Sequence, residues 1–199
     1  VSNFSNALNE LATIYFRLDQ LDKSNDLLRE GKDYLEKTAQ TASQTYMAIL
    51  INLGLNLVDL NQPEQARIYQ QQALDDYQEA STISTFPLYK TQAQLNQFSL
   101  LVKNNRLSKA ENLLVPIANN LEQLPPSRQA IYARINFARS LLKMPSITEQ
   151  KREREIAEIL NTAIAQARKI EDLRSESFAV GTIGQFYAQT GKPQLAQKL

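Results

Sequence analysis

The sequence contains no cysteine, no histidine and no tryptophan. Without cysteine the chain has no disulfide, no thiolate nucleophile and no zinc–sulfur site. Without histidine it lacks the most frequent general base and the most frequent transition-metal ligand. Ser-His-Asp and Cys-His catalysis are therefore excluded within the chain. We expect no metal and no cofactor, and we predict that the chain is not an enzyme.

Glycine and proline are scarce, with 5 and 7 residues, which argues against a loop-rich or disordered chain. The 22 basic and 21 acidic residues give a net charge of +1, without the cationic excess typical of nucleic-acid binding. The longest apolar stretch, Met47–Val58, contains two asparagines and is shorter than the roughly 20 residues of a membrane span. We therefore expect neither nucleic acid nor a membrane as partner. We expect a cytoplasmic protein, and a periplasmic one stays open because the N-terminus looks truncated.

Alanine, leucine, glutamine, glutamate and lysine dominate the chain, and these residues favour helices. One pattern recurs about every 42 residues: apolar residues at helical spacing around a small residue, then a turn, then a second amphipathic helix. A fixed period of this length predicts stacked helical hairpins. The small position falls, copy by copy, at Ala12, Gly54, Phe98, Ala138 and Gly184, with phenylalanine replacing the small residue in the third copy.

The repeat predicts local geometry as well. A leucine in place of Gly54 should overpack the contact between the two helices of its copy. Gly191 suits the left-handed residue that ends a helix, and Pro193 suits the first turn of the next one. The same turn slot is filled in other copies by Asp19-Gln20, Asn61-Gln62-Pro63 and Asn104-Asn105.

We interpret residues 1–199 as a single repeat domain cut from a larger protein. The fourth copy has extra residues between its helices, in the region 144–155, which is either an exposed start of its second helix or a spur for a partner. The five copies span approximately 1–40, 41–82, 83–124, 125–170 and a truncated 171–199.

The order of large residue, leucine, small residue and tyrosine in Leu8, Leu11, Ala12 and Tyr15 resembles the tetratricopeptide repeat. The unit is longer than the standard repeat and resembles long-helix variants such as those of kinesin light chains. Segment 172–187 is similar to repeats that precede caspase-like CHAT domains in bacterial, especially cyanobacterial, proteins. The resemblance implies an all-α solenoid, a right-handed superhelix of about ten antiparallel helices.

In such repeats the first helix of each copy lines the concave face. The residue before its key apolar position is Asn52, Asn96 and Asn136 in copies two to four. Their amides could clamp the backbone of an extended peptide. Alternatively, they are polar filler on an exposed face or bond an adjacent helix. The other candidates on this stripe, four of them cationic and suited to an acidic peptide, are Arg17, Ser99, Lys103, Arg139, Lys143 and Gln185.

We therefore predict a scaffold or sensor that binds a protein or an extended peptide and regulates an attached effector domain, which itself could be the partner. One alternative is a self-associating array that dimerises through the truncated C-terminal helix. Another is an all-α enzyme, which requires carboxylates that converge in a closed pocket. The neighbours Asp75 and Asp76 point about 100° apart on a helix and are expected to face solvent.

Overall fold

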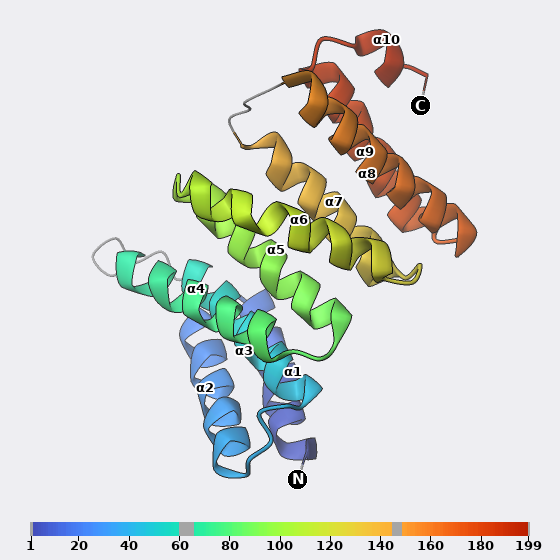
Figure 1. Cartoon of the computed structure of the whole chain (residues 1–199). Coiled ribbons are helices and arrows are strands. Elements are labelled where there is room, and N and C mark those ends of the chain that lie inside the picture. The colour runs from blue at the N-terminus through green and yellow to red at the C-terminus, as the bar shows by residue number, and fades with distance from the viewer. Residues whose placement is uncertain (1, 60–65, 145–148, 199) are drawn as a thin grey trace. The chain divides into compact units, whose positions relative to one another are not determined.

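The computed structural model describes residues 2–59, 66–144 and 149–198, which form ten α-helices and no strand (Figure 1). The expected all-α fold is confirmed. The predicted turn at 61–63 and most of the extra segment of the fourth copy lie outside the described residues. The helices are α1 (Ser2–Arg17), α2 (Leu21–Lys37), α3 (Gln44–Asp59), α4 (Ala66–Ile83), α5 (Pro87–Lys103), α6 (Leu107–Gln123), α7 (Arg128–Leu142), α8 (Glu149–Lys169), α9 (Leu173–Gln189) and α10 (Pro193–Ala196).

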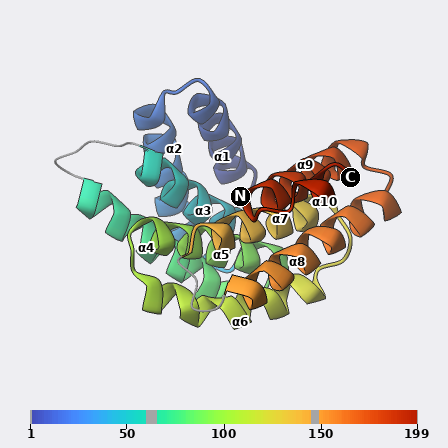
Figure 2. The same ribbon diagram turned by 90° about the horizontal axis from the view of Figure 1, so that it is seen from above.

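The chain divides into two compact units, residues 1–100 and residues 101–199. Within each unit, helices that follow one another in the chain pack as antiparallel pairs. The pair α1 and α2 lies side by side in both views (Figures 1 and 2). Among the described residues, no helix is long and apolar enough to cross a lipid bilayer.

Amphipathic spacing explains how these helices pair. α2 buries Ser24, Leu28, Gly31 and Leu35, which recur every three or four residues and therefore share one face. The remaining positions of α2 are mostly charged or polar and face solvent. α8 repeats the arrangement with Ile156, Leu160, Ala163 and Ala167.

Among the described residues, five helices end in the same backbone motif. Its left-handed residue has φ between 53 and 72°, and the next N–H bonds the carbonyl five residues earlier, as Gln20 N does with Tyr15 O at 2.9 Å. The turn slot predicted from Gly191, Asp19 and Asn105 is confirmed. Two further members were not predicted. The left-handed residues are Asp19, Ala39, Asn105, Glu171 and Gly191.

In the part of unit 2 that the structure describes, side chains cap the starts of two helices. Ser127 Oγ accepts a hydrogen bond from Ala130 N at the start of α7, and Asp172 Oδ1 accepts one from Ser175 N at the start of α9, both at 3.2 Å. Asp172 also binds Arg128 Nε at 2.7 Å, and these donors hold the pKa of its carboxyl well below the usual range. The predicted role of Pro193 at the start of α10 is confirmed.

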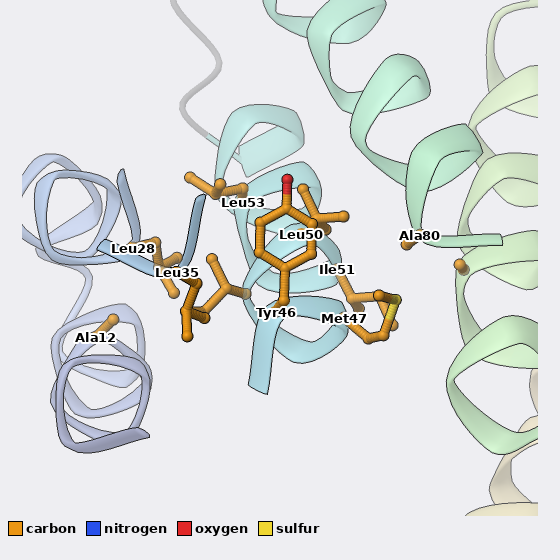
Figure 3. Close-up of a cluster of buried hydrophobic side chains, with 11 residues drawn as sticks. Ala12, Leu28, Leu35, Tyr46, Met47, Leu50, Ile51, Leu53 and Ala80 are labelled. Atoms are coloured by element: carbon orange, nitrogen blue, oxygen red, sulfur yellow. The ribbon is translucent and has the colours of Figure 1, made fainter. Parts of the chain in front are cut away.

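The core of unit 1 is built around α3 (Figure 3). Tyr46, Met47 and Leu50 are buried, with side chains of α1 and α2 on one side of α3 and Ala80 of α4 on the other. Gly54 lies against the ring of Tyr77, so that a Cβ atom at this position would stand 2.7 Å from Tyr77 Cζ. The expected need for a small residue at Gly54 thus has a direct structural cause.

The core of unit 2 is formed by α7 together with α8 and α9. Ile131, Ile135 and Phe137 of α7 are fully buried, as are Leu160 of α8 and Ile183 of α9. These residues hold α7 and α9 as neighbouring helices. The exposed sides of α7 and α9 carry Asn136, Arg139 and Gln185, three of the predicted binding residues.

Candidate peptide-binding surface

In unit 1 the predicted groove residue Asn52 is half-buried on α3. Its Nδ2 donates a hydrogen bond to Oδ1 of Asn9 on α1, at 2.9 Å. The sequence left open whether this asparagine binds a peptide, is polar filler or bonds an adjacent helix. In the structure, Asn52 bonds an adjacent helix. Arg17, the other candidate in this part of the chain, is exposed at the end of α1.

A buried polar chain beside Asn52 links the first three helices. Asn56 Nδ2 donates to Ser24 Oγ, and Ser24 Oγ donates to Ala12 O, both at 2.8 Å. The hollow that remains beside these residues is about 40 Å³, little more than room for water. Sequence reasoning missed Asn9 and Asn56, although both lie on the same helices as predicted residues. Asn9, Asn52 and Asn56 of unit 1 thus join neighbouring helices.

On α5 the predicted residues share a face. Asn96 is half-buried, and Ser99 and Lys103, three and seven residues further on, are exposed. The adjacent Gln97 turns the other way and donates from Nε2 to Oε1 of Gln78 on α4 at 2.8 Å. The contact with α4 is thus made by Gln97, on a different side of α5 from Asn96, Ser99 and Lys103.

In unit 2 the predicted residues of α7 lie in the open. Asn136, Arg139 and Lys143 are exposed on α7 or at its end. The guanidinium carbon of Arg139 stands 6.0 Å from the centre of the Phe178 ring on α9, a cation–π arrangement. Tyr132, one turn before Asn136, places its ring 5.3 Å from the same phenylalanine.

Gln185, the remaining candidate, lies on α9 and lines an open hollow on that helix. Gly181 also lines the hollow, and a Cβ atom at this position would meet nothing within 4 Å. We call α7 and α9 residues on this side of unit 2 the α7/α9 surface. Its members are Tyr132, Asn136, Arg139, Lys143, Arg174, Ser177, Phe178, Gly181, Thr182 and Gln185.

Sequence reasoning did not single out Tyr132, Arg174 or Phe178. Phe178 is half-buried, with Arg139 and Tyr132 against its ring. One signal was available, because Tyr132, Asn136, Arg139 and Lys143 follow one another at four, three and four residues along a single helix face. The structure places Asn136, Arg139 and Lys143 together with Gln185 in unit 2.

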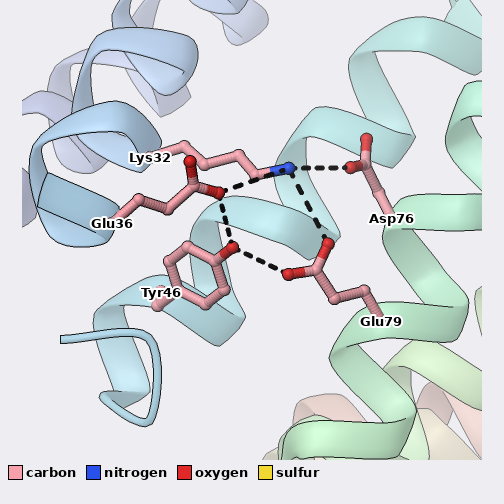
Figure 4. Close-up of polar contacts among 5 residues, drawn as sticks. All are labelled: Lys32, Glu36, Tyr46, Asp76 and Glu79. Carbon is pink, nitrogen blue, oxygen red and sulfur yellow. Dashed lines mark hydrogen bonds and ion pairs between the residues drawn. The ribbon is translucent and has the colours of Figure 1, made fainter. Parts of the chain in front are cut away.

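A separate polar cluster lies between α2, α3 and α4 of unit 1 (Figure 4). Lys32 Nζ is 3.6 Å from Asp76, 3.8 Å from Glu79 and 3.9 Å from Glu36. The Tyr46 hydroxyl lies 2.8 Å from Glu36 and 2.7 Å from Glu79. We call these five residues the Lys32 cluster.

Burial dominates the electrostatics of the Lys32 cluster. It raises the pKa of the Tyr46 hydroxyl far above its usual value, and the hydrogen bonds to two carboxylates act in the same direction. Burial also raises the pKa of Asp76 from 3.8 to about 6, although Lys32 opposes the shift. Asp75 is exposed as expected, but the same expectation for Asp76 is wrong, because its carboxylate turns towards Lys32.

Carboxylates also gather in unit 2. Glu122, Glu155 and Glu158 line a hollow of about 420 Å³ together with Arg134. Arg134 is buried, and its guanidinium donates hydrogen bonds to the carbonyl oxygens of Ala130, at 3.2 Å, and Leu121. Glu122 and Glu158 are exposed to solvent. Neither acidic group, within the residues that the structure describes, is the closed carboxylate pocket that the enzyme alternative requires.

Antiparallel helix pairs that repeat along the chain define the class of helical-hairpin repeat proteins. Residues 47–81, which run from α3 into α4, match the tetratricopeptide repeat model. The chain therefore carries tetratricopeptide-like repeats, and the repeat type predicted from the sequence is confirmed. No curated protein matches it in sequence.

Two solved structures share the fold. They are crystal structures titled as Podosopora anserina putative kinesin light chain nearly identical TPR-like repeats, one of them of a variant. Each is 18% identical in sequence and covers 97% of this chain. The TM-scores are 0.67 and 0.66, and 89% and 90% of the two matched chains are covered. At this level of identity the likeness concerns the fold.

Proposed function

We propose that the chain is a protein-recognition module that binds an extended acidic peptide on the α7/α9 surface. The chain carries tetratricopeptide-like repeats, and such repeats generally serve as scaffolds for protein–protein interaction, which supports the proposal. The observation that supports this particular surface is the position of Arg139, held over Phe178 beside the exposed amide of Asn136. The proposed peptide binding thus rests on exposed side chains that are not engaged in contacts between helices.

The α7/α9 surface offers three kinds of contact. Arg139, Lys143 and Arg174 are exposed cations that can pair with carboxylates of a peptide. The Asn136 amide can donate to and accept from the peptide backbone. Phe178 and Tyr132 supply apolar area at the centre. These groups stand on packed helices and are already ordered. Most of the conformational entropy lost on binding is therefore that of the bound peptide.

The proposal includes regulation of an effector domain, either attached to the same polypeptide or bound through the peptide. What supports this part is the similarity of segment 172–187 to repeats that precede CHAT domains. That segment contributes Arg174, Ser177, Phe178, Gly181, Thr182 and Gln185 to the surface. An effector that engages α9 would therefore compete with a peptide for the same residues.

A charge-reversal experiment tests the peptide proposal. The probes are a fluorescein-labelled extended peptide rich in aspartate and glutamate and a second peptide in which lysine and arginine replace these acids. At about 50 mM salt we expect the acidic probe alone to raise the fluorescence anisotropy in a saturable way, and high salt should weaken this binding. Arg139→Glu should reduce the affinity about tenfold or more.

The matched control is Lys109→Glu, the same change of charge at an exposed position on α6. It should lower the affinity far less than Arg139→Glu. If the two variants lose the same affinity, the effect is one of net charge, and this would contradict binding at the α7/α9 surface. Equal binding of both probes would contradict the preference for acidic peptides.

The remaining predicted residues enter the same assay. Gln185 is already part of the α7/α9 surface, and we propose that the predicted residues of α1, α3 and α5 make peptide contacts of their own: Arg17, Asn52, Asn96, Ser99 and Lys103. The triple variant Asn52→Ala, Asn96→Ala, Asn136→Ala should then lose more affinity than Asn136→Ala while the melting temperature stays within a few degrees. If the triple and single variants bind alike, recognition is confined to the α7/α9 surface.

A further inference from the structure

The hollow of about 420 Å³ in unit 2, lined by Arg134 and three glutamates, has room for a small molecule. In the described part of unit 2, α6 and α8 both pack on α7 but not on each other. Arg134 and Phe137 of α7 therefore lie between the two outer helices, and both residues are buried. We call this space the α6/α8 hollow.

The arginine in the α6/α8 hollow is already committed to the fold. Its guanidinium donates to the carbonyl oxygen of Leu121, in the last turn of α6, and to that of Ala130. Carbonyl groups at the end of a helix lack partners within the helix, and a cation beside them is stabilising. Burial lowers the pKa of Arg134, and the charge of Glu122 opposes this shift. Arg134 thus holds the end of α6 and is not a free donor for an anionic ligand.

The three glutamates of the α6/α8 hollow are differently placed. Glu122 stands on α6, whereas Glu155 and Glu158 stand one turn apart on α8. Among the described residues, none of these carboxylates forms an ion pair with a lysine or arginine side chain. Three carboxylates against one guanidinium leave an excess of two negative charges around the hollow. This excess favours a cationic ligand.

The amide of Gln166 indicates the same kind of ligand. Thr162 and Gln166 follow Glu158 at successive steps of four residues, so all three share one face of α8 and line the hollow. Oε1 of Gln166 is buried and has no hydrogen-bond partner, which is rare and costly for an acceptor. The Thr162 hydroxyl donates to the carbonyl oxygen of Glu158 at 2.8 Å, so its oxygen can still accept. A ligand that satisfies these groups must bring N–H or O–H donors.

We propose that the α6/α8 hollow binds a free linear aliphatic amine with at least two ammonium groups. One ammonium group pairs with the glutamate of α6 and another with the two glutamates of α8. The methylene chain between them lies on Leu121, Phe137 and Ile159, the apolar side chains of the hollow. Two ammonium groups match the excess of two negative charges, whereas a monoamine or the single lysine side chain of a protein leaves one charge unbalanced.

This site is separate from the α7/α9 surface. Arg134 and Phe137 are buried, whereas Asn136 and Arg139 are exposed, and at 3.6 residues per turn the two pairs lie on different sides of α7. The α6/α8 hollow binds a cation, whereas the α7/α9 surface binds an acidic segment. The two proposals can therefore fail separately.

Isothermal titration calorimetry with three amines tests the proposal. The probes are putrescine, a linear diamine, spermidine, a linear triamine, and butylamine, a monoamine. At about 50 mM salt we expect the diamine and the triamine to bind in a saturable way with one molecule per chain. Butylamine should bind about tenfold or more weakly. The double variant Glu155→Gln, Glu158→Gln should weaken the binding of putrescine about tenfold or more.

The control for charge is the double variant Glu30→Gln, Glu111→Gln, which removes two carboxylates at exposed positions on α2 and α6. It should leave the affinity for putrescine nearly unchanged. Equal losses in the two double variants would show that the amines respond to net charge alone, and this would overturn the proposal. So would the absence of saturable binding.

A second set of variants tests the shape of the site. Ala118 is half-buried and lines the hollow, so Ala118→Leu should fill it and weaken the binding of putrescine about tenfold or more without changing the charge. Gln166→Leu should also weaken the binding, while the melting temperature stays the same or rises because a buried acceptor without a partner is removed. Binding that survives both changes would contradict the site. A lysine-rich peptide that binds where putrescine and spermidine do not would assign the hollow to a protein partner, which also overturns the proposal.

Discussion

Asn52 in α3 and Asn136 in α7 stand at the same place in their repeats, two residues before Gly54 and Ala138. Asn52 is half-buried and bonded to Asn9 of the neighbouring first helix, whereas Asn136 is exposed. Register along a repeat thus determines the side of the helix on which a residue lies. The neighbouring helix determines whether its polar group remains available to a partner.

Charged residues show the same contrast between the units. In unit 1 three carboxylates surround Lys32, and two of them, Glu36 and Glu79, also accept hydrogen bonds from the Tyr46 hydroxyl. In unit 2 three glutamates line a hollow, and the buried Arg134 beside them bonds backbone carbonyls instead. The Lys32 cluster is an internal contact of unit 1. Asn136, Arg139 and Lys143 of unit 2 are exposed, which is why we place recognition there.

The largest difference in stability between matched variants of the two units is expected at Gly54 and Gly181. Gly54→Leu should lower the free energy of unfolding by about 3 kcal/mol, because the new side chain would enter the space of the Tyr77 ring. Gly181→Leu is the matched change in unit 2, where a Cβ atom has open space. We expect it to leave stability within about 1 kcal/mol of the original. Urea unfolding followed by circular dichroism measures both, and similar losses would contradict the difference in packing.

The Lys32 cluster predicts a pH dependence. The folded-state pKa of Asp76, about 6, lies above the unfolded value of 3.8. Its contribution to stability is therefore complete below the unfolded pKa and is lost as the pH rises through about 6. Compared with Asp76→Asn, the original chain should lose about 2 kcal/mol of unfolding free energy between about pH 4 and pH 7.

Asp75→Asn is the control for this measurement, because Asp75 is the exposed neighbour of Asp76. Its pH profile of stability should follow that of the original chain. If Asp76→Asn also follows it, Lys32 and Tyr46 compensate the buried carboxylate at all these pH values. The Lys32 cluster would then be as insensitive to pH as an exposed surface.

The smallest effect concerns the two asparagines. Asn52→Ala removes the bond to Asn9 and should cost about 0.5–1.5 kcal/mol in the free energy of unfolding. Asn136→Ala should change stability by less than about 0.5 kcal/mol, because the residue is exposed. Equal effects on thermal unfolding would show that the bond between Asn52 and Asn9 adds nothing in solution.

The period of the small residues was enough to predict the helices and their repeat type, because burial at i, i+3 and i+4 requires a helix whatever its partner. Gly54 and the turn at Gly191 were predictable for the same local reason. The surroundings of Asp76 and Phe178 were not. Whether Asp76 meets Lys32 depends on how α2 lies beside α4, and the ring of Phe178 is placed by α7. Contacts between side chains of different helices do not produce a residue pattern of fixed spacing in the sequence, so the sequence did not predict them.

The shared motif at five helix ends bears on how such a chain changes over evolutionary time. One of its five left-handed residues is glycine, and the others are aspartate, alanine, asparagine and glutamate. The turn is held by backbone N–H and carbonyl groups, which every residue except proline provides. Substitutions can therefore accumulate at these corners without changing the path of the chain. Such tolerance is consistent with a fold that is shared along 97% of the chain by a structure only 18% identical in sequence.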